Sequence, residues 1–108
     1  MEQDKKDFYD SLFLTLILNF QSSAMIGMGK ILNPVTNKIT KNMNEAKLSI
    51  DMLEMLSVMT KGNLKEDLSK LLQKVLTELR LNYVDELEKD KKEKEKDTKK
   101  NNEDKKSK

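Results

Sequence analysis

The sequence predicts an all-α protein of three helices. A long uncharged first helix is followed by an antiparallel helical hairpin with a charged C-terminal extension. Two observations support this class. Pro occurs once and Gly three times in 108 residues, while the helix formers Leu, Lys, Glu and Met are frequent. Apolar residues also recur at helical spacing in three separate segments.

The composition divides the chain into a body and a tail. Residues 88–108 contain no apolar side chain and carry ten lysines against seven acidic residues, whereas the remainder is nearly neutral. We therefore expect a frayed N-terminus over residues 1–7, a three-helix domain over 8–87, and a charged helical extension and disordered tail over 88–108.

The chain has no Cys and no His. This excludes cysteine nucleophiles, disulfides and the usual zinc and haem ligands. It also removes the side chain that most often performs general acid–base catalysis near neutral pH. We therefore expect a protein that is not an enzyme and binds no metal or cofactor.

The first helix is expected to include Ser11 to Gly29, a run of 19 residues without a charge. One apolar stripe follows helical spacing, and further leucines spread apolar surface over the other sides. The stripe contains Phe13, Ile17, Phe20, Ala24, Met28 and Ile31. A helix that is apolar all round is buried on all sides. One short chain cannot easily supply that cover, so a second copy is expected to do so.

Two other interpretations of this run were weighed. A signal peptide needs a positive N-terminal region, but acidic residues outnumber lysines before Ser11. A membrane span has about the required length, yet Asn19 and Gln21 would lie at its centre, where polar groups cost most. A cytoplasmic protein is expected. A small membrane-associated protein with residues 11–29 inserted is kept as the alternative.

The turn after the first helix centres on Asn33 and Pro34. Pro34 lacks a backbone N–H and biases Asn33 away from the helical region, so this pair is expected to end the helix. Asn37 can adopt a left-handed conformation at low cost. A second helix is then expected from about Asn42 to Lys61, with a stripe of Met43, Ala46, Ile50, Leu53 and Leu56.

The corner between the second and third helices has the sharpest local signal. Gly62 suits the position that follows a helix end, and Asn63 suits a helix N-cap with Glu66 three residues on, as in a capping box. The third helix is expected to begin at Leu64. It should continue as a charged rod to about Asp97, with disorder from Asn101 onward.

Five blocks occur in a characteristic order. They are Ser23-Ala24-Met25-Ile26 with Met28-Gly29, Asn33-Pro34-Val35-Thr36, Ala46-Lys47 with Ile50-Asp51 and Leu53, Thr60-Lys61-Gly62-Asn63-Leu64, and Leu79-Arg80 with Tyr83-Val84. From about Phe8 to Glu86 the chain thus resembles the bacterial domain-of-unknown-function family 1844. It departs from that pattern at Asn37, where the family usually has Gly, and at Met59, where it usually has a charge. The resemblance implies a short, intracellular, mostly helical bacterial protein and no activity.

Three groups of side chains have a chemical interpretation beside a structural one. Lys47, Asp51 and Glu54 could transfer protons, but their helical spacing is typical of a surface salt-bridge cluster. The seven methionines could suit Cu(I), yet without His or Cys they are better explained as core or interface. The lysine-rich tail could contact phosphates, but interleaved acids and missing aromatics favour a solvating tail.

We therefore predict a non-enzymatic helical interaction or assembly module that acts through apolar helix faces. The expected partner is a second copy or another helical protein. A nucleic-acid accessory protein acting through the lysine-rich tail is the second alternative. The predicted interface residues are Leu16, Ile17, Phe20, Met25, Met28, Met52, Met55 and Met59. The predicted turn residues are Asn33, Pro34, Gly62, Asn63 and Glu66.

Overall fold

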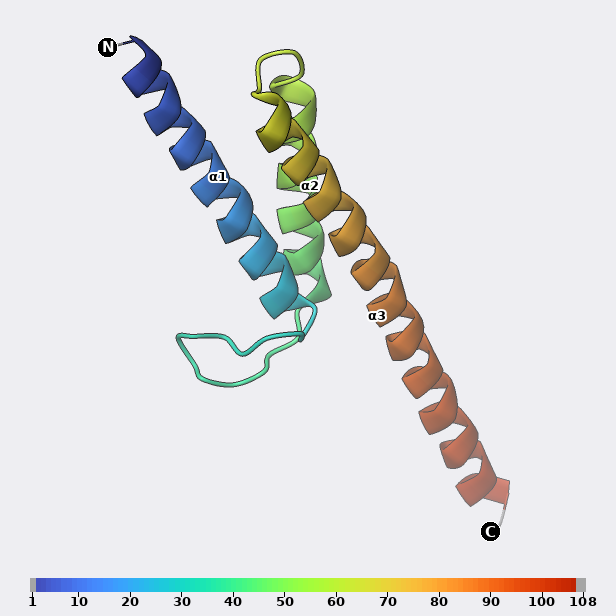
Figure 1. The fold of residues 1–108 in the computed structure, drawn as a ribbon. Helices are drawn as coiled ribbons and strands as arrows, with labels where there is room; N and C mark the ends of the chain where they lie inside the picture. Colours follow the sequence, from blue (N-terminus) through green and yellow to red (C-terminus); the bar gives the residue numbers. More distant parts are fainter. Residues whose placement is uncertain (1, 107–108) are drawn as a thin grey trace.

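The computed structural model describes residues 2–106, with side chains described as far as residue 96. It contains α1 (Glu2–Gly27), α2 (Met43–Met59) and α3 (Glu66–Lys106) (Figure 1). Over the described residues there is no strand, only an isolated bridge between Asn33 and Lys38. The predicted all-α class, with three helices in this order, is confirmed.

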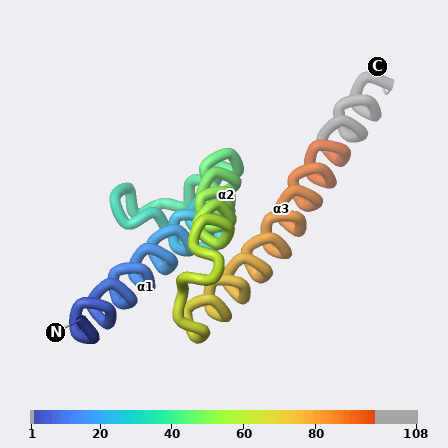
Figure 2. Tube along the Cα trace, turned by 90° about the horizontal axis from the view of Figure 1, so that it is seen from above, coloured from blue at the N-terminus to red at the C-terminus, as the bar shows by residue number. Residues whose placement is uncertain are grey.

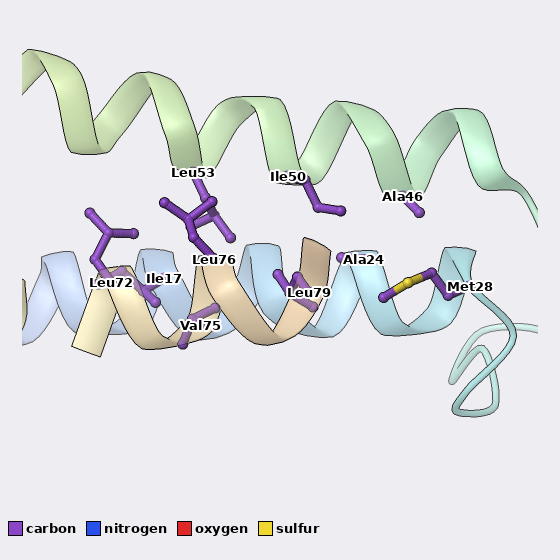
Figure 3. Packing of buried hydrophobic residues seen from close by; sticks show 10 residues of the cluster. All are labelled: Ile17, Ala24, Met28, Ala46, Ile50, Leu53, Leu72, Val75, Leu76 and Leu79. Atoms are coloured by element: carbon purple, nitrogen blue, oxygen red, sulfur yellow. The ribbon is translucent and has the colours of Figure 1, made fainter. Parts of the chain in front are cut away.

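The core forms where all three helices meet. The inward residues of α2, Ala46, Ile50 and Leu53, face side chains from both other helices (Figure 3). These are Ile17, Ala24 and Met28 of α1 and Leu72, Val75, Leu76 and Leu79 of α3. Half-buried aromatic and aliphatic side chains surround this cluster. Burial of apolar surface on one face of each helix therefore holds the bundle together.

Gly27 sets the contact between α1 and α2. A Cβ atom built on Gly27 would lie 2.8 Å from the Asn42 carbonyl oxygen and 2.9 Å from the Ala46 backbone nitrogen. The Asn42 N–H donates to the Gly27 carbonyl at 2.8 Å. Only a residue without a side chain allows the two backbones to approach this closely.

Helix α1 ends earlier than predicted, and for a different reason. Gly29 has a left-handed φ of 77°. Its N–H donates to the Ile26 carbonyl, and the Lys30 N–H donates to the Met25 carbonyl at 2.9 Å. This pair of bonds is the Schellman motif, which closes a helix at a glycine. The expectation that Asn33 and Pro34 end the helix was therefore wrong, because Gly29 stops it first.

The connection from α1 to α2 projects from the bundle as a folded loop (Figure 1). The Asn33 side chain accepts from the Val35 N–H at 2.9 Å, which is an Asx turn, and the Asn33 N–H donates to the Lys38 carbonyl. Asn37 has a φ of 55°, so its predicted left-handed conformation is confirmed. Pro34 lies inside this turn, not at the helix end.

Local hydrogen bonds define the start of α2 and the turn that follows its end. The Asn42 side chain accepts from the Glu45 N–H at 3.2 Å and forms the N-cap of α2. Gly62, with a φ of 81°, lies in a turn in which the Asn63 N–H donates to the Thr60 carbonyl at 2.9 Å. The corner predicted at Gly62 is therefore present.

The predicted N-cap of α3 at Asn63 is not formed. Helix α3 begins at Glu66, and its first bond runs from the Ser69 N–H to the Lys65 carbonyl. Glu66 is thus the first residue of the helix instead of the third. It and Asp67 place two carboxylates in the first turn, where the helix dipole favours negative charge.

The N-terminal segment of the chain and its C-terminal segment are both more helical than predicted. Helix α1 begins at Glu2, with Glu2 and Asp4 in its first turn, although residues 1–7 were expected to fray. Helix α3 continues to Lys106, beyond the end expected near Asp97 and into the tail predicted to be disordered. The predictions for Met1, Ser107 and Lys108 lie outside the described residues.

The molecule is elongated. Its extents are 78 × 29 × 16 Å, and its radius of gyration is 19.2 Å, whereas a compact domain of this length has about 13 Å. Figure 2 shows why: α3 extends past the part of the chain that packs against α1 and α2. The first half of α1 also diverges from the bundle (Figure 1).

Candidate interaction surface

The predicted interface residues divide into two groups. Ile17 and Met28 are fully buried in the core of the single chain. Phe20 and Met25 are half-buried and pack against that core. Leu16, Met52, Met55 and Met59 are exposed. The structure thus brings the first four into intramolecular packing and leaves the last four on the surface.

The exposed side of α2 carries an apolar stripe of its own. Its exposed stripe consists of Leu48, Met52, Met55 and Met59, at spacings of four, three and four residues. Residues so spaced lie on one side of a helix. Met55 is 42% exposed and Met59 is 76% exposed. Because Ala46, Ile50 and Leu53 already fill the inward side, these methionines are not needed for the core.

Helix α1 widens this surface along one edge of α2. Leu16 precedes Gly27 by about three helical turns, so both lie on the side of α1 that faces α2. Leu12 lies one further turn back, and both leucines are exposed. We call the six residues Leu12, Leu16, Leu48, Met52, Met55 and Met59 the outer apolar face. Exposed apolar side chains in a row on one helix, with further exposed leucines on the neighbouring helix, are typical of an interaction site.

The other edge of α2 is charged and faces α3. Arg80 of α3 pairs with Glu54 at 3.5 Å, and Lys47 pairs with Asp51 at 3.0 Å along the helix. The predicted salt bridge of Lys47 and Asp51 is therefore present, between half-exposed groups. The hydrogen bond to Asp51 raises the pKa of Lys47, so its side chain stays protonated at neutral pH and has no free amine to accept a proton.

A shallow pocket of about 370 Å³ lies beneath the corner between α2 and α3. Three of its polar side chains form hydrogen bonds within the chain. The Gln73 amide donates to the Ser57 hydroxyl, and the Thr60 hydroxyl donates to the Leu56 carbonyl at 2.6 Å. Over the described residues, no buried side-chain nitrogen or oxygen lacks a hydrogen-bond partner. Much of the polarity of Ser57, Thr60 and Gln73 is therefore already used within the chain.

Glu86 of α3 anchors the projecting loop. Lys30 approaches its carboxylate at 2.6 Å and Lys41 at 2.8 Å, and Lys41 also reaches Asp90 at 2.6 Å. Glu86 itself is only 7% exposed. The hydrogen bonds from Lys30 and Lys41 lower its pKa from 4.5 to about 2. The two lysines lie at the two ends of the loop, so this cluster closes it against α3.

The loop exposes apolar side chains while its backbone is well bonded. Ile31, Leu32, Val35 and Ile39 are all exposed, Val35 almost completely at 91%. The sequence analysis placed Ile31 in the apolar stripe of the first helix, which was wrong because Gly29 ends that helix first. It treated residues 33–37 as a turn and proposed no surface there. Its NPVT residues indicated a turn, but nothing in them indicated that neighbouring apolar residues would remain outside the core.

Sequence reasoning also missed two members of the outer apolar face, Leu12 and Leu48. A usable signal existed for Leu48. It begins the spacing of four, three and four residues that continues through Met52, Met55 and Met59, and that spacing indicates a helix-pairing seam. For Leu12 no such signal existed, because the uncharged helix carries leucines on every side.

The described part of the chain lacks two features that would indicate a membrane protein or a metalloprotein. No helix there is long and apolar enough to cross a membrane. No group of three or more acidic residues there is arranged to hold a metal ion.

Comparison with known proteins identifies a family. A family model described as "Domain of unknown function (DUF1844)" matches residues 10–86. No curated protein and no solved structure matches the chain. The matched range includes the three-helix core, the projecting loop and the whole outer apolar face.

Proposed function

The chain belongs to the DUF1844 family, and we propose that it is a non-enzymatic assembly module. Its outer apolar face would bind a helix of a second copy or of another protein. The observation that carries the proposal is the two-sided apolar character of α2. One side is fully used in the core, and the other exposes Leu48, Met52, Met55 and Met59.

The size of the face supports association. Its six exposed fractions together amount to about three fully exposed side chains per copy. Burying these in two copies stabilises a complex by roughly 10–15 kcal/mol. Association costs about 4–15 kcal/mol in lost translational and rotational freedom. Hydrophobic burial on this face is therefore of the size needed to offset that cost.

The chemistry of the face supports a helix as the ligand. Ridges at a spacing of four and three residues interdigitate with the same spacing on another helix. Methionine is flexible and polarisable, which suits a surface that must adapt to a partner. The charged edge with Lys47 and Asp51 would remain in solvent at the rim.

Light scattering on a sizing column, with a charge introduced at the centre of the face, tests this proposal. Met55→Asp should leave the helical content unchanged, because Met55 is outside the core. It should reduce the parent's mass to that of a monomer, because association would bury a charge without a partner. Leu81→Asp is the matched control. Leu81 is exposed on α3, outside the outer apolar face, and this variant should keep the parent's mass.

Two results would contradict the proposal. The parent chain could elute as a monomer at every concentration tested, with no helical partner retained. Alternatively, Met55→Asp could keep the same oligomeric mass as the parent and as Leu81→Asp. Circular dichroism of both variants distinguishes lost assembly from lost folding.

A further inference from the structure

We propose that the occupant of the outer apolar face is a second copy of this chain, with the two α2 helices antiparallel about a twofold axis. The axis would pass between Met52 and Met55. This inference rests on the proposed function, because it specifies the partner and its orientation at the same surface. Three features of the described residues support it.

The first feature is that the stripe is self-complementary. Leu48, Met52, Met55 and Met59 have the same spacing when the helix is reversed, since four, three, four is a symmetric order. In an antiparallel pair, Met52 of one copy faces Met55 of the other, and Leu48 faces Met59. The same patch on both copies is what a twofold interface requires. A second copy of the chain therefore supplies a helix with the matching stripe.

The second feature is the difference between the two edges of α2. Leu12 and Leu16 are exposed beside one edge of α2, whereas the opposite edge carries Lys47, Asp51 and Glu54 together with one exposed apolar residue, Val58. A twofold axis perpendicular to antiparallel helices brings like edges together. The leucines of both copies then lie on the same side of the helix pair, and the charged groups of both copies stay together at the other rim.

A parallel pair of α2 helices would bring unlike edges together. Its axis runs along the helices, so the apolar edge of one copy lies beside the charged edge of the other. Leu12 and Leu16 would then cover the Asp51 and Glu54 side, where covering charged groups is unfavourable. The asymmetry of the edges therefore selects the antiparallel orientation.

The third feature is electrostatic. Antiparallel α2 helices place the positive N-terminal end of one helix dipole beside the negative C-terminal end of the other. This electrostatic contribution to the stability of the pair is small, but like the difference between the two edges of α2 it favours the antiparallel orientation.

The absence of cysteine allows a direct test of orientation. Leu48→Cys and Met59→Cys are prepared as separate full-length variants, one of them carrying an affinity tag. Each is oxidised alone, and then the two are oxidised after mixing. We expect the disulfide between the two variants to exceed either self-pair severalfold, because only residues 48 and 59 of opposite copies approach within cross-linking distance.

Leu81→Cys provides the control for random collision. Leu81 is exposed on α3 outside the face, so its cross-linked fraction gives the background. Circular dichroism and light scattering of the reduced variants show that fold and mass match the parent. Because Leu48 and Met59 are both exposed, neither substitution should disturb the core.

Three other outcomes would contradict the orientation, the position of the interface or the assembly itself. Self-pairs at residues 48 and 59 that exceed the mixed pair would overturn the antiparallel orientation, while the assembly proposal would stand. A parent of dimeric mass with cross-linking at background level would show that α2 is not the seam. A parent of monomeric mass would overturn both this inference and the proposed function.

Discussion

Glu86 shows how a single residue can organise a distant segment. Its carboxylate is held by Lys30 and Lys41, which lie at the two ends of the loop between α1 and α2. The sequence around Glu86 gives no sign of this role, because a charged residue late in α3 has the same pattern as its solvent-exposed neighbours. Only the packing of the loop against α3 identifies the partners.

Glu86→Gln should destabilise the fold by about 1–3 kcal/mol, because the ammonium groups of Lys30, Lys41 and Lys89 lose this charged acceptor. Denaturant unfolding at pH 7 measures the loss. Glu88→Gln is the matched control, since Glu88 is exposed on the same helix, and its variant should unfold like the parent.

The pH dependence of stability gives a second readout of the same pair of variants. The pKa of Glu86 is lowered from 4.5 to about 2 in the fold, so its stabilising contribution is fully present above pH 4.5 and is lost as the pH falls towards 2. The parent should lose stability across this window more steeply than Glu86→Gln. Equal slopes for the two proteins would contradict the assigned role of Glu86.

At the scale of elements, the sequence predicted the number, order and inward stripes of the helices, because apolar periodicity depends only on local spacing. Ala46, Ile50 and Leu53 of α2 are buried as predicted. The helix ends were harder to predict, since several local signals compete there. Gly29 closes α1 before Pro34 can, and α3 begins at Glu66 although Asn63 is a good capping residue.

The crossing of α1 and α2 depends on Gly27. Gly27→Ala should destabilise the protein by about 1–3 kcal/mol, although alanine favours helices, because its Cβ would lie 2.8 Å from the Asn42 carbonyl oxygen. Thermal unfolding followed by circular dichroism measures the effect. Ser23→Ala, at an exposed position of the same helix, should leave stability unchanged or slightly higher. An equal midpoint for Gly27→Ala and the parent would show that the backbones can separate without cost.

For the whole molecule, the sequence predicted that the apolar surface exceeds what one short chain can bury. It could not predict how that surface divides between core and exterior. Ile17 and Met28 went to the core, while Leu16 and three methionines of α2 remained outside. An all-apolar helix has no polar side to mark its orientation, so the division follows only from the packing of α2 and α3.

If the chain assembles as proposed, its thermal stability should depend on concentration. The unfolding midpoint of the parent should rise as protein concentration increases, because mass action favours the folded oligomer. Scanning calorimetry over a hundredfold concentration range tests this. Met55→Asp should have a lower midpoint that does not change with concentration. A constant midpoint for the parent would contradict assembly as a source of stability.

The length of α3 has a consequence for what the two ends of an assembly can connect. Helix α3 runs antiparallel to α2 and extends beyond the end of α2 at which Asn42 lies (Figure 1). Reversing one copy on the other sends the two C-terminal helices outward in opposite directions. A pair assembled in the proposed way would separate its two C-termini. Groups attached there would be held far apart, whereas a parallel pair would bring the same groups together.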